Sequence, residues 1–294
     1  MDFYANLHLH STHSDGVYSP RELVRIAKEE GYSALAITDH DTASAYSELK
    51  EACAEYGMQC IFGAEFTVPP PHDYHIVGFN FDPEYPPMKK YLADMAHRQT
   101  DNTKKCFDEA VEKGKISGVT WDDVLEFNRG IPWLCNNHVF NLLMARGIEK
   151  EENYMKWFDE NFRYQRGKYP PVCNFLPVNE LIALIRAAGG FAVLAHPFTR
   201  GLNHLDELIE MGLEGVEVWH ADMSEEERAR AYKLALEKGL FISGGSDHSG
   251  LLGGYYSSYP NEEELKKSHI YIEPHSVGTT REYFEEIKSG KINR

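Results

Sequence analysis

The chain has 294 residues, 42% of them hydrophobic, which is enough for one large α/β domain or for one domain that carries an insert. Its formal net charge of −16 argues against broad contact with long nucleic acid, because such contact depends on a basic surface. No stretch reaches the ~18 apolar residues of a membrane span, and the N-terminus lacks a signal-peptide pattern, so we expect a cytoplasmic protein with no membrane partner.

The first third of the chain alternates short apolar runs with helical patterns, which is typical of α/β proteins with parallel strands. Ser19, Pro20 and Glu22 predict a capped helix start, and Gly31 predicts the end of that helix. The elements expected next are a strand over 32–38, a helix over 42–57, and strands over 58–66 and 75–79.

Long helical patterns with few strand-like runs then cover residues 85–171, and Thr120 with Asp123 predicts a capping box among them. Alternation resumes with helices over 178–190, 205–212 and 224–239 and strands over 191–195, 215–219 and 240–245. Ser224 and Glu227 predict a further capping box. We therefore expect an α/β domain formed by residues 1–90 and 172–294, with a helical insert domain over 91–171.

Histidines and carboxylates gather near the ends of the expected strands. The residues placed in this way are His8, His10, Asp39, His40, Glu65, His75, His196, His220, Asp247 and His248. Barrel-type α/β proteins build active sites at the C-terminal ends of their strands. One such histidine alone could equally satisfy backbone groups, but the recurrence favours a common site.

Spacing and residue type indicate a metal site. His8 and His10 stand two apart in a strand, so both project to one face. Joined by Asp15 and the strand-end residues, they make a mixed imidazole and carboxylate set that suits Mn, Fe or Zn better than Ca or Mg alone. Because so many ligands exceed the needs of one ion, a carboxylate such as Glu65 could bridge two metals.

With these motifs in place, the chain resembles the PHP family, the polymerase and histidinol phosphatase superfamily of metal-dependent phosphoesterases. The motifs that carry the resemblance are "HLHSTHSDG", "ITDHD", "GAEF", "HIVGF", "LAHP" and "GGSD". The resemblance implies a distorted parallel (β/α)7 barrel. Within the family the chain is most similar to phosphatases of nucleoside monophosphates, nucleoside 3′,5′-bisphosphates or 5′ ends of short oligoribonucleotides.

The resemblance also implies a site for three metals, and we expect two to three divalent transition metals (Mn, Fe or Zn). The implied ligands are His8, His10, Glu65 and Asp247 for one metal, Glu65, His75 and His196 for a second, and Asp15 and His40 for a third. Family members usually end with Asp-x-His, whereas this chain has Asp247 followed directly by His248. Either His248 completes the third group, or that group is weakened or lost.

The expected reaction is release of phosphate from a small phosphorylated substrate, with a metal-bridging hydroxide as nucleophile and no protein nucleophile. The candidates for substrate contact are Arg200, Lys168, His220 and Arg129, although a solvated surface charge explains each of them equally well. His138 could also substitute for part of an Arg-Pro-His run that the similar phosphatases carry. A histidinol-phosphate phosphatase and a noncatalytic metal-binding module are the alternative functions.

Overall fold

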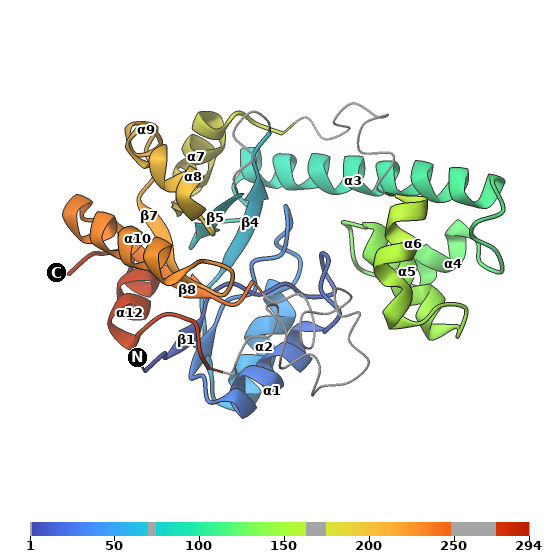
Figure 1. Ribbon diagram of the computed structural model, residues 1–294, viewed down its shortest axis with the longest axis horizontal. Coiled ribbons are helices and arrows are strands. Elements are labelled where there is room, and N and C mark those ends of the chain that lie inside the picture. Colours follow the sequence, from blue (N-terminus) through green and yellow to red (C-terminus); the bar gives the residue numbers. More distant parts are fainter. Residues whose placement is uncertain (1, 70–74, 163–174, 248–274, 294) are drawn as a thin grey trace.

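A computed structural model of the chain describes residues 2–69, 75–162, 175–247 and 275–293 (Figure 1). The strands are β1 Ala5–Asn6, β2 Ala34–Leu35, β3 Gln59–Cys60, β4 Gly63–Thr67, β5 His75–Phe79, β6 Phe191–Leu194, β7 Gly215–His220 and β8 Phe241–Gly245. The helices are α1 Pro20–Glu30, α2 Tyr46–Tyr56, α3 Pro86–Glu112, α4 Trp121–Phe127, α5 Asn136–Ala145, η1 Glu151–Asn153, α6 Tyr154–Asn161, α7 Val178–Ala187, α8 Phe198–Asn203, α9 Leu205–Glu210, α10 Glu225–Lys238 and α12 Arg281–Ser289.

Helix starts follow the capping signals of the sequence. The reciprocal capping boxes of Ser19 with Glu22, Thr120 with Asp123 and Ser224 with Glu227 are all present, before α1, α4 and α10. Each pair satisfies backbone N–H groups that the first turn of a helix leaves unpaired. Gly31 ends α1 in the left-handed conformation, with φ 101°, as the sequence predicts.

The strands form two sheets in the order β1-β2-β3 and β4-β5-β6-β7-β8. Backbone hydrogen bonds join these sheets at both sides. Leu7 N–H donates to Gly244 O at 3.1 Å, which places β1 beside β8, and Glu65 N–H donates to Thr38 O at 3.1 Å, which places β4 beside the chain that follows β2. The fold is therefore an α/β fold with parallel pairing in both sheets.

The expectation of wholly parallel strands is wrong at β5, which pairs antiparallel with both β4 and β6. Only residues 68–74 separate β4 from β5, and a parallel crossover needs a longer connection. The single strand expected over 58–66 is also wrong. It divides into β3, which pairs with β2, and β4, which pairs with β5, because the chain changes partner between them.

Helix α3 links two hydrophobic cores. Met88, Tyr91 and Met95 in its first half belong to the large core around the sheets. Cys106 and Phe107 in its second half pack in a separate core with residues of α4, α5 and α6. Figure 1 shows α3 extending from the sheets to this helical group. The predicted domain boundary between residues 90 and 91 falls inside α3, whose residues are continuous across it.

Strand β8 approaches the chain after β1 so closely that only glycine fits at position 245. A Cβ atom there would lie 2.3 Å from His8 N and 2.4 Å from His8 Cβ. Asp247 N–H then donates to His8 O at 2.9 Å, which continues the contact. Gly245, the second glycine of the "GGSD" motif, is therefore required by its packing against His8.

We expect Gly245→Ala to lower the free energy of unfolding by about 3 kcal/mol. The added methyl group would overlap the backbone of His8, and neither β8 nor the chain after β1 can move away without breaking its contacts. Denaturant unfolding monitored by circular dichroism measures this. The control is Gly57→Ala, where φ is 66° and no atom lies within 4 Å, so only a backbone cost of about 1 kcal/mol applies. Equal losses in the two variants would contradict the packing argument.

Candidate metal centre

The sheets bring the strand-end histidines and carboxylates to one place. His8 and His10 follow β1, His40 follows β2, and Asp247 follows β8. The antiparallel direction of β5 explains why His75 opens its strand yet lies at the same edge, because it pairs with Thr67 at the end of β4. A site at the carboxyl ends of parallel strands therefore gains one ligand from the amino end of an antiparallel strand.

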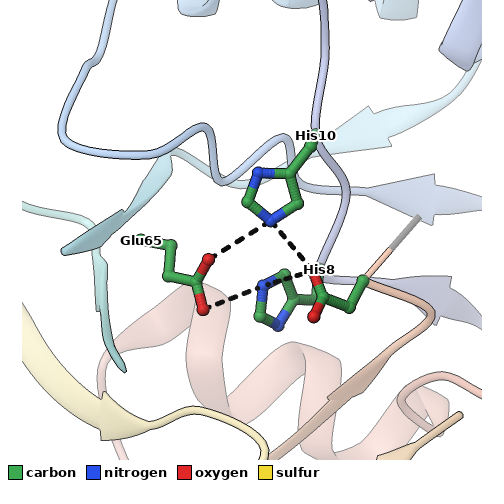
Figure 2. A group of neighbouring side chains, drawn as sticks. His8, His10 and Glu65 are labelled. Atoms are coloured by element: carbon green, nitrogen blue, oxygen red, sulfur yellow. Dashed lines mark ion pairs between the residues drawn. The ribbon is translucent and has the colours of Figure 1, made fainter. Parts of the chain in front are cut away.

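Glu65 lies at the centre of the cluster, and Figure 2 shows His8, His10 and Glu65 pointing toward one another. Its Oε1 lies 3.4 Å from His8 Nε2, and its Oε2 lies 3.2 Å from His10 Nε2. Asp247 Oδ1 lies 3.0 Å from His10 Nε2. One nitrogen or oxygen atom from each of these four residues lies within 4.8 Å of the others, so together they could hold one metal ion.

Two further groups adjoin this one. Glu65 Oε1 also lies 3.0 Å from His75 Nδ1 and 2.9 Å from His196 Nε2. Asp15 lies 3.3 Å from His10 Nδ1 and 3.8 Å from His40 Nε2. The structure thus gathers every predicted ligand except His248, which lies outside the described residues.

Several buried side-chain atoms in the described part of the chain form no hydrogen bond of acceptable geometry, although each lies 3.0–3.4 Å from a side-chain atom of another cluster residue. They are His8 Nε2, His10 Nε2, His40 Nδ1 and Glu65 Oε2. A buried polar atom without a hydrogen bond costs about 1–3 kcal/mol, so four of them in one cluster require a common explanation. A divalent cation accepts such nitrogen and oxygen donors together, and the residues present therefore fit a metal centre.

Glu217 is a supporting residue that the strand-end rule does not find. Its carboxylate oxygens lie 3.1 and 3.2 Å from His8 Nδ1, and Oε2 also accepts from His196 N–H at 2.8 Å. A carboxylate on the far nitrogen of a ligating histidine fixes the ring and its tautomer. The available signal is a glutamate inside the apolar strand "GVEVW", because a buried charge needs a partner.

His220 and Asp39 support other ligands. His220 Nδ1 accepts from Asp222 N–H at 3.1 Å, so in the neutral tautomer Nε2 donates to Asp247 Oδ2 at 3.3 Å. Asp39 accepts from Ser11 N–H at 2.7 Å and from Ser14 Oγ at 2.6 Å, which holds the loop before Asp15. Both ring nitrogens of His220 are engaged in this way, and its contact with substrate stays a prediction.

The other substrate-contact candidates are exposed or lie outside the described residues. Arg200 is exposed in α8. Arg129 is 77% exposed and pairs with Glu126 at 2.5 Å. Lys168 lies outside the described residues. Their roles in binding substrate remain predictions.

The cluster balances its charges internally. Burial alone would raise the pKa of Glu65, but the neighbouring imidazoles of His75, His8 and His40 hold that pKa well below its ordinary value. Burial likewise opposes protonation of His8, yet the carboxylates of Glu217, Asp247 and Glu65 raise its pKa well above 6.5. A divalent cation would take the place of these protons, so its binding releases protons and strengthens as pH rises.

His138 is buried and serves the structure in its neutral form. Its Nδ1 accepts from Cys135 N–H at 2.9 Å, and its Nε2 donates to Thr12 O at 3.0 Å. Burial lowers the pKa of His138 to about 4. With both nitrogens engaged, His138 ties α5 to the loop that follows His10.

A comparison with known proteins identifies the family. The sequence profile of the PHP domain matches residues 6–165, which is more than half of the chain, and the chain therefore belongs to the PHP family. Among the described residues, the helices lack the combination of length and apolar character that a bilayer span requires. Membership of this family, together with the cluster of histidines and carboxylates, identifies the protein as a metal-dependent phosphoesterase.

Individual relatives of the chain are named for several different activities. A 5′-3′ exoribonuclease Rnm of Salmonella typhimurium is 32% identical, covering 82% of this chain and 84% of its own length. A phosphoribosyl 1,2-cyclic phosphate 1,2-diphosphodiesterase of Eggerthella lenta is 28% identical, with coverage of 84% and 95%. A 3′,5′-nucleoside bisphosphate phosphatase of Chromobacterium violaceum is 27% identical, with coverage of 82% and 86%.

The fold has a close counterpart among solved structures. A protein of Bifidobacterium adolescentis, described as a metal-dependent phosphoesterase, superposes with a TM-score of 0.72 at 26% identity. The superposition covers 100% of this chain and 98% of the other. The comparison thus extends over both the sheets and the helical group around α5.

We expect Glu217→Gln to weaken metal binding by about 10- to 100-fold, because the neutral amide no longer holds His8 as a carboxylate does. Calorimetric titration of the metal-free protein with Mn²⁺ measures the affinity. Glu226→Gln, the same change at an exposed position of α10, is the control. Unchanged affinity in Glu217→Gln would show that His8 does not depend on this carboxylate.

His138 makes stability depend on pH in the acid range. Its pKa is about 4 in the folded chain and 6.5 as the ordinary value, so the unfolded chain takes up the proton first as pH falls. The stabilisation is complete above pH 6.5 and is lost progressively down to pH 4. Between pH 7 and pH 5 the loss is about 2 kcal/mol.

The variant His138→Gln should lack this part of the pH dependence, which urea unfolding of chelator-treated protein at pH 7 and pH 5 would reveal. His97→Gln, at a position whose side chain is 77% exposed, should follow the native protein. If His138→Gln loses as much stability as the native chain on acidification, the buried neutral imidazole is not the cause.

Proposed function

We propose that the protein releases phosphate from small nucleotides, namely nucleoside 3′,5′-bisphosphates, nucleoside monophosphates and the 5′ ends of short oligoribonucleotides. The observation that carries the proposal is the buried cluster around Glu65, with four ligand atoms that lack hydrogen-bond partners. Support for the substrate class comes from the relatives named as an exoribonuclease and a nucleoside bisphosphate phosphatase.

The residues divide into three metal groups that share members. His8, His10, Glu65 and Asp247 would hold one divalent cation, Glu65 with His75 and His196 a second, and Asp15 with His40 a third. When bound, such cations activate water and neutralise charge on the phosphate. We propose Mn, Fe or Zn, two to three per chain, because the ligands mix imidazole with carboxylate.

The chain's own residues prepare the site for this chemistry. Glu217 orients His8, His220 orients Asp247, and Asp39 holds the loop of Asp15. Two of the ligands also have backbones in the left-handed region, His196 at φ 25° and Asp247 at φ 52°, and such strain concentrates at functional sites. No side chain in the cluster needs to act as a nucleophile in this proposal.

The proposal includes a fold in which the strands close into one distorted barrel carrying a helical insert. It is supported by the hydrogen bonds that join β1 to β8 and β4 to the chain after β2. It is also supported by the separate core of the helical group. In a closed barrel the ligands converge at one mouth, which explains how segments far apart in sequence share Glu65.

A second candidate function has specific support. The relative named as a cyclic phosphate diphosphodiesterase matches 95% of its own length, so its substrate chemistry is a real alternative. A phosphorylated ribose carrying a cyclic phosphate shares the sugar and the phosphate of a nucleotide but lacks the base. Turnover of nucleotides and of phosphoribosyl cyclic phosphate therefore separates the two.

The deciding experiment follows hydrolysis of adenosine 3′,5′-bisphosphate, AMP, a 5′-phosphorylated trinucleotide, phosphoribosyl 1,2-cyclic phosphate and histidinol phosphate, with Mn²⁺ present. Phosphate release is measured beside chromatography of the products, because opening a cyclic phosphodiester frees no phosphate. We expect the nucleotides to give the highest kcat/KM. A chelator should abolish release, and added Mn²⁺ should restore it. Glu65→Gln should lower kcat/KM by at least about 100-fold, because Glu65 joins the groups that stabilise charge in the transition state.

Glu226→Gln again serves as the matched control and should keep native activity. Thermal unfolding of both variants shows whether they are folded. Hydrolysis confined to histidinol phosphate or to the cyclic phosphate would overturn the nucleotide assignment. Activity that survives both chelation and Glu65→Gln would overturn the metal-dependent mechanism at this cluster.

A further inference from the structure

The loop that carries Asp15 is held from two sides. On the side of the sheets, Asp39 accepts hydrogen bonds from Ser11 and Ser14. On the other side lies the first turn of α5, which belongs to the helical group. The loop that carries Asp15 is therefore held between the sheets and the helical group.

Three contacts join the start of α5 to backbone carbonyls of this loop. His138 Nε2 donates to Thr12 O at 3.0 Å, and Cys135 Sγ lies 3.6 Å from Ser14 O as a weak donor. Asn137 Nδ2 donates to the carbonyl of Asp15 itself at 2.6 Å. Cys135, Asn137 and His138 are all at most 5% exposed, so water does not compete for these bonds.

Asn137 is itself held in position. Tyr154 Oη, from α6, donates to Asn137 Oδ1 at 2.8 Å, and Asn136 Nδ2 contacts both groups at 2.7 Å. With its oxygen accepting from a tyrosine, the amide must present its NH₂ group to Asp15. The network runs without a break from α6 through Asn137 to the ligand loop.

Small displacements of this loop matter because it folds tightly onto His10. A Cβ atom at Gly16 would lie 2.2 Å from His10 O. The Asp15 carboxylate, one residue earlier, reaches His10 and His40 at 3.3 and 3.8 Å. The carbonyl that Asn137 holds is covalently adjacent to the Cα that directs this carboxylate.

We propose that the first turn of α5 positions the metal group built on Asp15 and His40, with Asn137 as the principal positioning residue. The inference rests on the metal assignment of the proposed function and is independent of the substrate. Among the described residues, no hydrogen bond or ion pair joins α5 to the side chains assigned to the other two cations, which are His8, His10, Glu65, Asp247, His75 and His196. Loss of the Asn137 contact should therefore weaken one metal group selectively.

The variant Asn137→Asp tests this with almost no change in size. A carboxylate oxygen would face the Asp15 carbonyl in place of an N–H donor, so the two acceptors repel. The matched control is Asn141→Asp, the same chemical change one turn further along α5 at a half-buried position. Tyr154→Phe is a milder variant that removes only the hydroxyl group holding Asn137.

The measurement is calorimetric titration of metal-free protein with Mn²⁺, beside elemental analysis of metal per chain after gel filtration. We expect Asn137→Asp to weaken one class of sites by about 10-fold or more and leave the tightest class at native affinity. Tyr154→Phe should show a smaller loss in the same class, and Asn141→Asp none. Thermal unfolding of each metal-free variant reports whether it is folded. If Asn137→Asp does not fold, the metal affinities of Tyr154→Phe decide the test.

Native affinities in both Asn137→Asp and Tyr154→Phe would overturn the inference, as would equal weakening of every class in a folded variant. The proposed function fails separately, if the native protein releases no phosphate from any nucleotide. In that case a selective loss of one metal class in Asn137→Asp would still support the positioning role.

Discussion

The carboxylate of Glu65 is fully buried, and the rest of the site is arranged around that charge. An isolated ionised carboxylate cannot be buried without compensation, so the fold must supply positive partners from several directions. Four strand ends place imidazoles around it, with His8 and His10 after β1, His40 after β2, His75 at the start of β5 and His196 after β6. Protons on His8, His10 and His75 balance part of the charge, because neighbouring carboxylates outweigh burial and raise the pKa of each, and divalent cations can replace the protons.

Residues outside the proposed ligand set hold the ligands in position. Strand β7 places Glu217 behind His8 and His220 behind Asp247, so one strand fixes ligands from both ends of the chain. The helical group contributes through α5, which contacts the loop of Asp15. Helix α3 packs in both cores and so connects the helical group to the sheets.

The sequence was most informative where a local rule has a direct physical cause. Capping boxes at Ser19, Thr120 and Ser224 were readable because each involves groups within one helical turn. That these histidines and carboxylates gather in one place was readable because strand ends converge in this class of fold. The division of β3 from β4 and the reversal of β5 were not, since an apolar run does not reveal which neighbour it pairs with. The contact of Asn137 with Asp15 depends on how the helical group packs, and no local pattern encodes it.

The hydrogen bonds around the site also span nearly the whole chain. Asn6 Nδ2 donates to Ser246 Oγ across 240 positions, and His8 meets Glu217 across 209. Contacts between residues so far apart in sequence form slowly, since the entropy cost of closing a long loop comes before the contact contributes any stabilising free energy. On the ribosome, the nascent chain cannot complete the site until β8 has emerged. Metal loading should therefore be one of the last events in the protein's maturation, and a chain interrupted before β8 would carry most of the ligands without the ability to use them.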